Sequence, residues 1–306
     1  MTQDNRNIDS RLAIDAVTAN NLRTANPSIG STGLRTHASR YDALRNVSGG
    51  RVAEEFLINS RLHRGDVEMG LSGLSYFTEQ AVAMLSLLGR EDRRGSRCLS
   101  LPKSVELHMN LGEVIRRRRS VRTYSGYAIP LAYLATIIRA ACGITRHTAE
   151  KDGVSGSAFR STPSAGALYP IDLHVAALHV EDLPRGLYVY DPRRDELWQT
   201  GDDGMVKAVL EALALPGRVI TEKQASAVCL LVGRPWRSMR KYGDRGMRFV
   251  FLEAGAMAEH INLAAVALGL GSVDCGSFYD DEVHEAMEID GLYEALIHPV
   301  FLGMPG

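Results

Sequence analysis

The longest apolar stretch of the chain, residues 251–268, constrains the fold more than any other feature. Its strongly polar residues are Glu253, Glu259, His260 and Asn262. These do not define a polar face, so a helix here is expected to be buried nearly all round. Small residues recur along the stretch and let another backbone approach closely, and Gly269 and Gly271 are expected to end the helix. We therefore expect a long central helix on which the other elements pack.

Composition sets the class of protein around this helix. The 306 residues allow one large domain or two ordinary ones, and 45% hydrophobic with 23% charged residues is typical of a soluble globular protein. A net charge of −1 argues against a nucleic-acid or membrane partner. The cysteines are far apart and are expected to be buried free thiols, and no apolar signal segment begins the chain, so we expect a cytoplasmic protein.

The remaining elements are predicted from periodicity and from turn formers. Residues 1–50 are polar and expected to be partly flexible, whereas 51–90 are expected to be helical, with a stripe at Phe77, Ala81, Met84 and Leu88. Further helices are predicted at 111–118, 131–142, 205–215 and 281–287. Strands are predicted at 172–180, 187–191, 196–200, 225–233 and 297–303. Pro299 demotes the last strand to a sheet edge or an exchanged arm. Because helices and strands do not alternate strictly, the fold class is α+β.

Several common motifs of catalytic proteins are absent. No G-x-G-x-x-G segment follows a strand and opens a helix, and there is no P-loop. The pair His284-Glu285 begins like a zinc-protease signature, but the position of the second histidine is Glu288. The histidines are dispersed, so no metal site is predicted.

A basic run begins at Arg116, and its positive charges must be either neutralised by an anion or exposed to solvent. Its residues are Arg116, Arg117, Arg118, Arg119, Ser120 and Arg122. One interpretation is a solvated helix end, where cations suit the helix dipole. A nucleic-acid patch is a second, weakened by the neutral net charge. A phosphate clamp is a third, because the planar guanidinium binds phosphate through two bonds and a serine hydroxyl adds a donor.

Several segments of the chain together resemble a known family. The segment Arg118-Arg119-Ser120-Val121-Arg122 is similar to the start of the FMN site in nitroreductase-like flavoproteins. Two further segments, 164–170 (SAGALYP) and 241–246 (KYGDRG), resemble the SagB/McbC-type azoline dehydrogenases, as do Glu253-Ala254-Gly255 and the segment 268–272 (LGLGS). The resemblance covers residues 107–306 and continues weakly through 55–90.

The resemblance implies a nitroreductase-like fold, with a mixed sheet flanked by helices and a long buried central helix, in an intertwined homodimer. Residues 106–306 would form the FMN-binding domain. Residues 1–105 would be an N-terminal appendage that helps dimerisation, covers the flavin or contacts the peptide. The implied FMN-binding residues are Arg118, Arg119, Ser120, Arg122, Ser164, Ala165, Gly166, Leu270, Gly271 and Ser272. The serine loop from Ser164 to Gly166 would reach the flavin ring from the same or the partner subunit.

The implied reaction oxidises thiazoline or oxazoline rings of a ribosomally made precursor peptide to thiazoles or oxazoles. The resemblance also implies Lys241 and Tyr242 as a catalytic pair, with a cyclodehydratase as a possible partner enzyme. Such an oxidation removes a ring Cα proton and a hydride, and FMN takes the hydride. The proton needs a positioned base. A neighbouring cation lowers the pKa of a tyrosine and burial lowers that of a lysine, so adjacency of the two has a rationale.

Two alternative functions stay open at this point. One is an FMN-dependent nitro- or quinone reductase fed by NAD(P)H, and the other is a flavin-free scaffold subunit of a peptide-modifying complex. One residue departs from the family pattern: Ala256 stands where a histidine often follows the glycine. A changed substrate would be consistent with that departure.

Overall fold

The structure, a computed structural model, describes residues 52–61, 97–147, 158–213, 220 and 224–306. The chain divides into two compact units, Met1–Asp66 and Val67–Gly306, and each is described by itself. In the first unit the described element is helix α3, Val52–Asn59. Residues 1–50 and the stripe expected between Phe77 and Leu88 lie outside the described residues.

A seven-stranded sheet forms the centre of the second unit, in the order β1-β6-β5-β4-β7-β9-β8. Its strands are β1 Cys98–Ser100, β4 Ile171–Ala177, β5 Gly186–Asp191, β6 Glu196–Gly201, β7 Ala227–Gly233, β8 Gly271–Asp274 and β9 Ala295–Gly303. The named strands pair antiparallel throughout, and parallel pairing occurs at the isolated bridges Ser120–Ser272 and Ile129–Val180. Strands β2 Ile144–His147 and β3 Ala158–Arg160 form a separate pair. The predicted hairpin is confirmed as β5–β6, and the buried strands predicted before and after it are β4 and β7.

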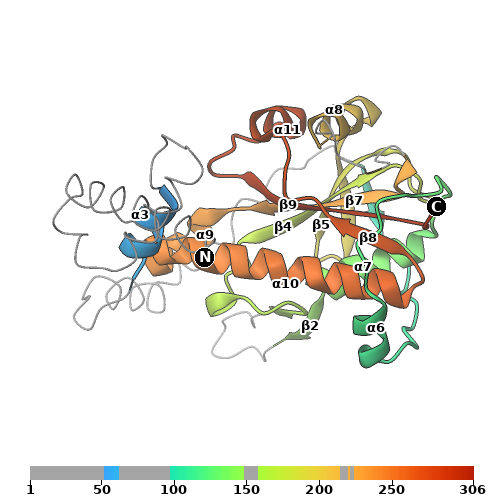
Figure 1. Ribbon diagram of the computed structural model, residues 1–306, viewed down its shortest axis with the longest axis horizontal. Helices are drawn as coiled ribbons and strands as arrows, with labels where there is room; N and C mark the ends of the chain where they lie inside the picture. The colour runs from blue at the N-terminus through green and yellow to red at the C-terminus, as the bar shows by residue number, and fades with distance from the viewer. Residues whose placement is uncertain (1–51, 62–96, 148–157, 214–219, 221–223) are drawn as a thin grey trace, which may run out of the picture. The chain divides into compact units, whose positions relative to one another are not determined.

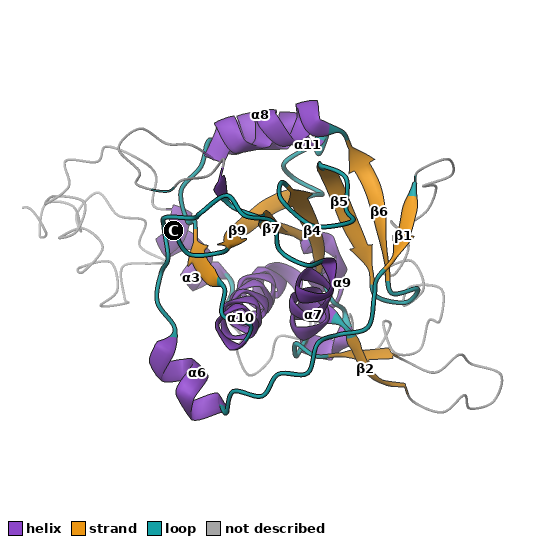
Figure 2. Cartoon of the chain, turned by 90° about the vertical axis from the view of Figure 1, so that its right-hand side faces the viewer, coloured by secondary structure: helices purple, strands orange, loops and turns teal. Residues whose placement is uncertain are grey.

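Helices cover both faces of the sheet (Figure 2). Helices α7 Leu131–Cys142 and α10 Gly246–Ala267 pack on one face, and α8 Asp203–Leu213 and α11 Asp280–Met287 on the other. Strand β7 shows why its sequence is a continuous apolar run. Ala227, Cys229 and Leu231 join the core under α7 and α10, and Val228, Leu230 and Val232 join the core under α8 and α11. The predicted α+β class, with a sheet flanked by helices, is confirmed.

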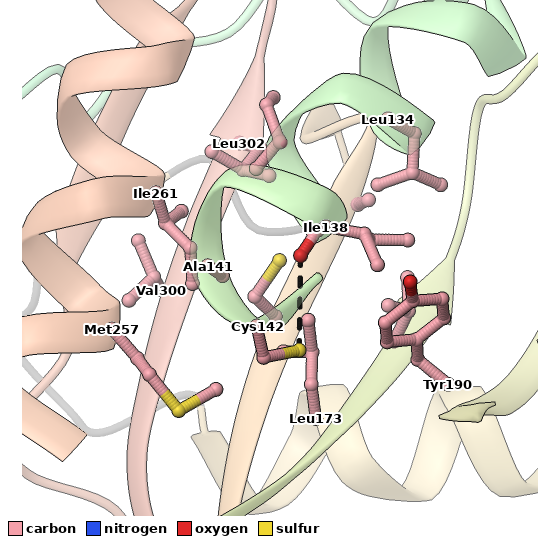
Figure 3. Close-up of a cluster of buried hydrophobic side chains, with 14 of the residues drawn as sticks. Leu134, Ile138, Ala141, Cys142, Leu173, Tyr190, Met257, Ile261, Val300 and Leu302 are labelled. Carbon is pink, nitrogen blue, oxygen red and sulfur yellow. Dashed lines mark hydrogen bonds between the residues drawn. The ribbon is translucent and has the colours of Figure 1, made fainter. Parts of the chain in front are cut away.

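The core under α7 and α10 is where the central helix meets the sheet (Figure 3). Met257 and Ile261 of α10, Ile138 and Cys142 of α7 and Val300 of β9 belong to this one cluster. The Cys142 thiol donates to the Ile138 carbonyl at 3.7 Å, as expected for a buried free thiol. Cys229 and Cys275 are also buried and free, but Cys98 is exposed, so the expectation of burial fails for that residue.

The prediction that Pro299 puts its strand at an edge is wrong. Strand β9 lies between β7 and β8, with Pro299 opposite Leu230 of β7. Its carbonyl accepts from Cys275 N–H at 2.9 Å, so the missing N–H also points to the β8 side. The β8 pairing ends one residue further on, at Asp274–Val300. The proline therefore occupies a position where the neighbouring strand has already ended, and the sheet tolerates it.

Helix α10 is long, as predicted, but one stripe of it is exposed in the single chain. Phe251 and Leu252 are 49% and 69% exposed, and Gly255 and Glu259 continue the same face. The expectation of burial nearly all round therefore holds for the sheet side of α10 and fails for this stripe. The segment Pro235–Ala267, which contains α10, is long and apolar enough to cross a membrane by length and composition alone. In this structure α10 packs on the sheet, and the core helix of a soluble protein passes the same test.

The N-terminal limit of the sheet lies before the proposed domain boundary. Strand β1 pairs with β6, and Leu101 is part of the core. The division between residues 105 and 106 stays a prediction, and the sheet extends to the N-terminal side of it.

Candidate functional site

The short helix α9, Pro235–Tyr242, presents the predicted catalytic pair. Pro235 occupies the first turn, where a missing N–H costs nothing, and Gly243 ends the helix with a φ of 54° that favours glycine. Arg237, Ser238 and Lys241 follow one another at helical spacing and form the buried face of α9. Lys241 is 5% exposed. A lysine is rarely this buried without a specific role or partner.

The serine loop of residues 164–170 meets this pair. Gly166 has a φ of 64°, and a Cβ added there would lie 2.7 Å from Tyr242 Oη and 2.8 Å from Lys241 Nζ. The glycine is therefore required both by its backbone conformation and by the close approach of the two side chains. Two sequence motifs separated by more than seventy residues are thus brought into contact.

The surroundings of Lys241 favour its neutral amine. Burial lowers the pKa of Lys241 below its usual value. Its Nζ lies 5.2 Å from the centroid of the Tyr242 ring, and the edge of that ring packs on Phe249 at 4.9 Å between centroids. A lowered pKa makes the neutral amine, which is the form that can accept a proton from a substrate, easier to reach than in an exposed lysine.

Glu253 lies in contact with the serine loop and is absent from the predicted site residues. It is 4% exposed, and it accepts hydrogen bonds from the Ser164 hydroxyl and the Ile171 N–H. Burial raises its pKa to about 7, against the opposing effects of Ser164, Arg160, Ile171 and Arg237. A carboxylate flanked by apolar residues was the signal in the sequence, because an ionisable group is seldom buried in such a position without a partner or a function. Ser164 also accepts from Tyr169 N–H at 2.9 Å, so its hydroxyl serves the loop itself.

The predicted phosphate clamp lies beside β8. Helix α6, Leu111–Arg117, ends at Arg118, and the chain then runs along the outer edge of β8. Ser120 forms a parallel bridge with Ser272, and Val121 N–H donates to the Ser272 carbonyl at 2.9 Å. Gly271 permits this approach, since a Cβ there would lie 2.6 Å from the Val121 side chain. The structure therefore places Ser120 beside Gly271 and Ser272.

Buried polar atoms at this end fit a bound polar group. Ser272 Oγ and Asn262 Oδ1 are buried and have no hydrogen-bond partner within the described part of the chain. A buried polar atom without a partner is costly, so a ligand that bonds to it would be stabilised. Asp274 accepts from Asn262 at 3.0 Å and contacts His298 at 2.9 Å, and the His298 bond lowers the pKa of this carboxyl group. Ser272 Oγ and Asn262 Oδ1 therefore offer hydrogen-bonding positions to a polar ligand beside β8.

Three of the predicted cofactor-binding residues make contacts within the chain. The Arg119 guanidinium donates to the carbonyls of Arg116 and Arg118, both at 2.7 Å, and so closes the end of α6. The Leu270 side chain is 4% exposed and packs in the core, leaving its backbone as the part that a ligand could meet. Arg122 donates to the Ser120 carbonyl at 3.4 Å and remains exposed.

The two groups of site residues lie toward opposite ends of α10. Figure 1 shows α9 near the beginning of this helix and α6 with β8 near its end. At ~1.5 Å per residue, the 22 residues of α10 span about 33 Å. Within one chain, the serine loop and Lys241 therefore do not meet the arginine segment. We name them the lysine end (Ser164, Gly166, Lys241, Tyr242, Glu253) and the arginine end (Arg118, Ser120, Arg122, Gly271, Ser272).

Comparison with known proteins settles the family. Residues 115–303 match the sequence profile of the Nitroreductase family. A protein of Methanocaldococcus jannaschii, provisionally named a nitroreductase, is 36% identical over 202 residues, which is 66% of this chain and 94% of that protein. The chain belongs to the nitroreductase family. Its matched segment contains both the arginine end and the lysine end.

Solved structures of nitroreductase-family proteins share the fold. A Ralstonia eutropha protein superposes with a TM-score of 0.55 at 25% identity, over 69% of this chain and 90% of that one. An Anabaena variabilis protein gives 0.55 at 24% identity, and this chain spans only 42% of its length. The E. coli microcin synthetase McbBCD complex with truncated pro-MccB17 bound contains a chain that gives 0.52 at 18% identity, over 83% of this chain and 92% of that one.

Among the residues that the structure describes, no group of three or more His, Cys, Asp or Glu side chains could hold a metal ion.

Proposed function

We propose that this nitroreductase-family oxidoreductase is an FMN-dependent azoline dehydrogenase that acts on a peptide, in the cytoplasm, as an intertwined homodimer. The observation that carries the proposal is the contact of Gly166 with Lys241 Nζ and Tyr242 Oη. It joins two of the motifs that resemble the azoline dehydrogenases into one constellation with a buried base. The fold is like that of a chain in the microcin synthetase McbBCD complex, which has truncated pro-MccB17 bound. The peptide substrate and a possible cyclodehydratase partner are proposed from the motif resemblance.

The dimer supplies the remaining part of the site. The arginine end and the lysine end lie toward opposite ends of α10, so a twofold axis across antiparallel α10 helices would bring one end from each subunit together. The exposed stripe of Phe251, Leu252 and Gly255 is apolar and offers a surface for that contact. Leu111 and Ile115 of α6, 64% and 57% exposed, extend the apolar surface at the arginine end.

In this proposal, separate residues bind the cofactor and remove the proton. Arg118, Ser120, Arg122 and Ser272 would hold FMN, which supplies hydride acceptance when bound. Lys241, whose pKa burial lowers, would take the ring Cα proton onto Nζ. Tyr242 orients the lysine through its ring face and packs on Phe249. The azoline ring loses a proton and a hydride and becomes aromatic.

The test is Lys241→Ala against the wild type, with a synthetic thiazoline- or oxazoline-containing peptide as substrate. The purified wild-type protein should release FMN on denaturation, and mass spectrometry should find the loss of two hydrogens per ring. The variant should keep FMN and lose azole formation by about 10²–10⁴-fold. Lys207→Ala is the matched control, because Lys207 is an exposed lysine paired with Asp203 on α8. Azole formation at the wild-type rate in Lys241→Ala would refute the role.

A second candidate is an FMN-dependent nitro- or quinone reductase fed by NAD(P)H. The M. jannaschii relative, 36% identical and provisionally named a nitroreductase, favours it. This function predicts NADPH oxidation with a nitroarene at the same rate in the wild type and in Lys241→Ala. A colourless protein that takes up no added FMN would exclude both enzymes and favour the flavin-free scaffold.

A further inference from the structure

The serine loop has an unusual backbone. Gly166, Ala167 and Tyr169 have φ values of 64°, 54° and 48°. The left-handed region is uncommon for residues with a side chain, and such conformations persist only where surrounding contacts hold them. In this loop, Ala167 and Tyr169 are the residues with a side chain that adopt it. Strained backbone of this kind is often found at functional sites.

Contacts around Tyr169 hold one end of the loop. Its carbonyl accepts from Arg237 at 3.1 Å, and its hydroxyl accepts from the Arg160 N–H at 3.0 Å. Arg237 is itself fixed by Asp172, at 2.8 and 3.0 Å. Ser164 holds the other end, where its hydroxyl accepts from Tyr169 N–H and donates to Glu253.

Glu253 anchors the serine loop to the central helix. Its carboxyl group accepts from Ser164 on the loop and from Ile171 at the start of β4, so it connects three segments of the chain. Its Oε2 atom is buried and lacks a hydrogen-bond partner in the described residues. Movement of the loop would displace Gly166, which is packed on Lys241 Nζ and Tyr242 Oη.

We propose that Glu253 is a positioning residue for the oxidation: through Ser164 it holds the serine loop so that Gly166 fixes Lys241 and Tyr242 in their reactive arrangement. This inference rests on the proposed function for its chemistry, but the anchoring itself does not. Both hydrogen bonds are donated to the carboxyl group, so the ionised form accepts them more strongly.

Charge on Glu253 therefore controls the loop. The charged groups that face it are Arg160 from β3 and Arg237 from α9, and Arg237 is paired with Asp172 of β4. Burial outweighs these cations and raises the pKa of Glu253 to about 7. While Glu253 stays buried on α10, the loop is held most firmly above that pH and loosens as the carboxyl group takes up a proton, because the Ser164 and Ile171 hydrogen bonds favour the ionised form.

The first measurement is hydrogen–deuterium exchange of peptides covering residues 164–171, corrected for the intrinsic rate, between pH 5.5 and 8.5. Wild-type protection should fall as the pH decreases through about 7. Glu253→Gln should lose that dependence and stay at the weakly protected level. Ser164→Ala, which removes the connection without touching the helix, should do the same. Glu211→Gln, a matched change of an exposed glutamate on α8, should follow the wild type.

The second measurement is the pH profile of azole formation. Glu253→Gln should lower kcat about tenfold or more, with KM for the peptide unchanged, and remove the wild-type inflection near pH 7. Unchanged exchange and an unchanged inflection in Glu253→Gln would overturn the proposal. If the wild type forms no azole but the exchange results hold, the proposed function has failed and the anchor stands. If azole forms and exchange is insensitive to Glu253, the anchor has failed alone.

Discussion

Single residues decide the geometry of the lysine end, and Gly166 shows how. It combines a positive φ with the absence of room for a Cβ, so no other residue fits without displacing Tyr242 or Lys241. The sequence motif named this glycine as a flavin contact, whereas the structure shows that it also packs on the two catalytic candidates.

We predict that Gly166→Ala lowers the free energy of unfolding by about 1–2 kcal/mol, because alanine is disfavoured in the left-handed region. It should also lower kcat for azole formation more than it weakens FMN binding, since the added methyl group displaces Lys241 and Tyr242. Denaturant unfolding and turnover measure the two effects. Gly276→Ala is the control, because a Cβ at Gly276 has no atom within 4 Å among the described residues. Equal kcat in both variants would contradict the packing argument.

Glu253 should make stability depend on pH. Its pKa of about 7 in the folded chain lies above the ordinary value of 4.5, so the folded state binds the proton more tightly. The stability this contributes is fully present below pH 4.5 and is lost as the pH rises through about 7. Over that window the wild type should lose on the order of 3 kcal/mol relative to Glu253→Gln, at ~1.36 kcal/mol per unit. Urea unfolding at several pH values measures it, and a difference independent of pH would rule out the buried titration.

Contacts between elements depend on glycines that periodicity does not reveal. Helices α9 and α10 join through the short turn Gly243–Arg245, and the backbones of the two helices come close at Gly246. A Cβ there would lie 2.8 Å from both Met239 N and the carbonyl carbon of Ser238. Since α9 carries Lys241, this contact sets the position of the proposed base.

We predict that Gly246→Ala destabilises the fold by about 1–3 kcal/mol through overpacking, although alanine is the better helix former. The matched control is Gly112→Ala in α6, where the nearest atom to the new Cβ is Asn110 Oδ1 at 3.5 Å. That change should be neutral or stabilising by about 0.5–1 kcal/mol. Thermal unfolding of both variants provides the comparison, and stabilisation by Gly246→Ala would show that the helices separate easily.

At the scale of the whole molecule, the arginine end and the lysine end are separated along α10 and would have to come from different subunits to form one site. If each site combines the arginine end of one subunit with the lysine end of the other, two inactive variants should complement each other. Coexpression of Arg118→Ala/Ser120→Ala with Lys241→Ala then gives heterodimers with one intact site and one site carrying both lesions. Random pairing predicts about a quarter of the wild-type activity.

The complementation experiment distinguishes the two arrangements because each predicts a different activity for the coexpressed variants. If each site lay within one chain, every site in the heterodimer would carry a lesion and activity would stay at the level of the separate variants. Size-exclusion chromatography of Leu252→Glu, which places a charge on the exposed stripe of α10, tests the interface separately and should yield monomers that lose FMN.

The sequence by itself determined several of the elements and supplied the proposed residues of the site. Local patterns were sufficient for the β5–β6 hairpin, for the α7 helix between Pro130 and Gly143, and for the long α10 helix, because turn residues and periodicity act over a few positions. The motif resemblance named Gly166 and Lys241 before any contact between them was known.

Only the tertiary structure decided how these parts meet. Pro299 lies in an interior strand because β8 ends beside it, which depends on a segment that pairs from elsewhere in the chain. The exposed stripe of α10, the anchoring of Ser164 by Glu253 and the separation of the two ends of the site likewise arise from long-range packing. A single sequence records which side chains are apolar or ionisable, but burial and proximity depend on what the fold places next to them.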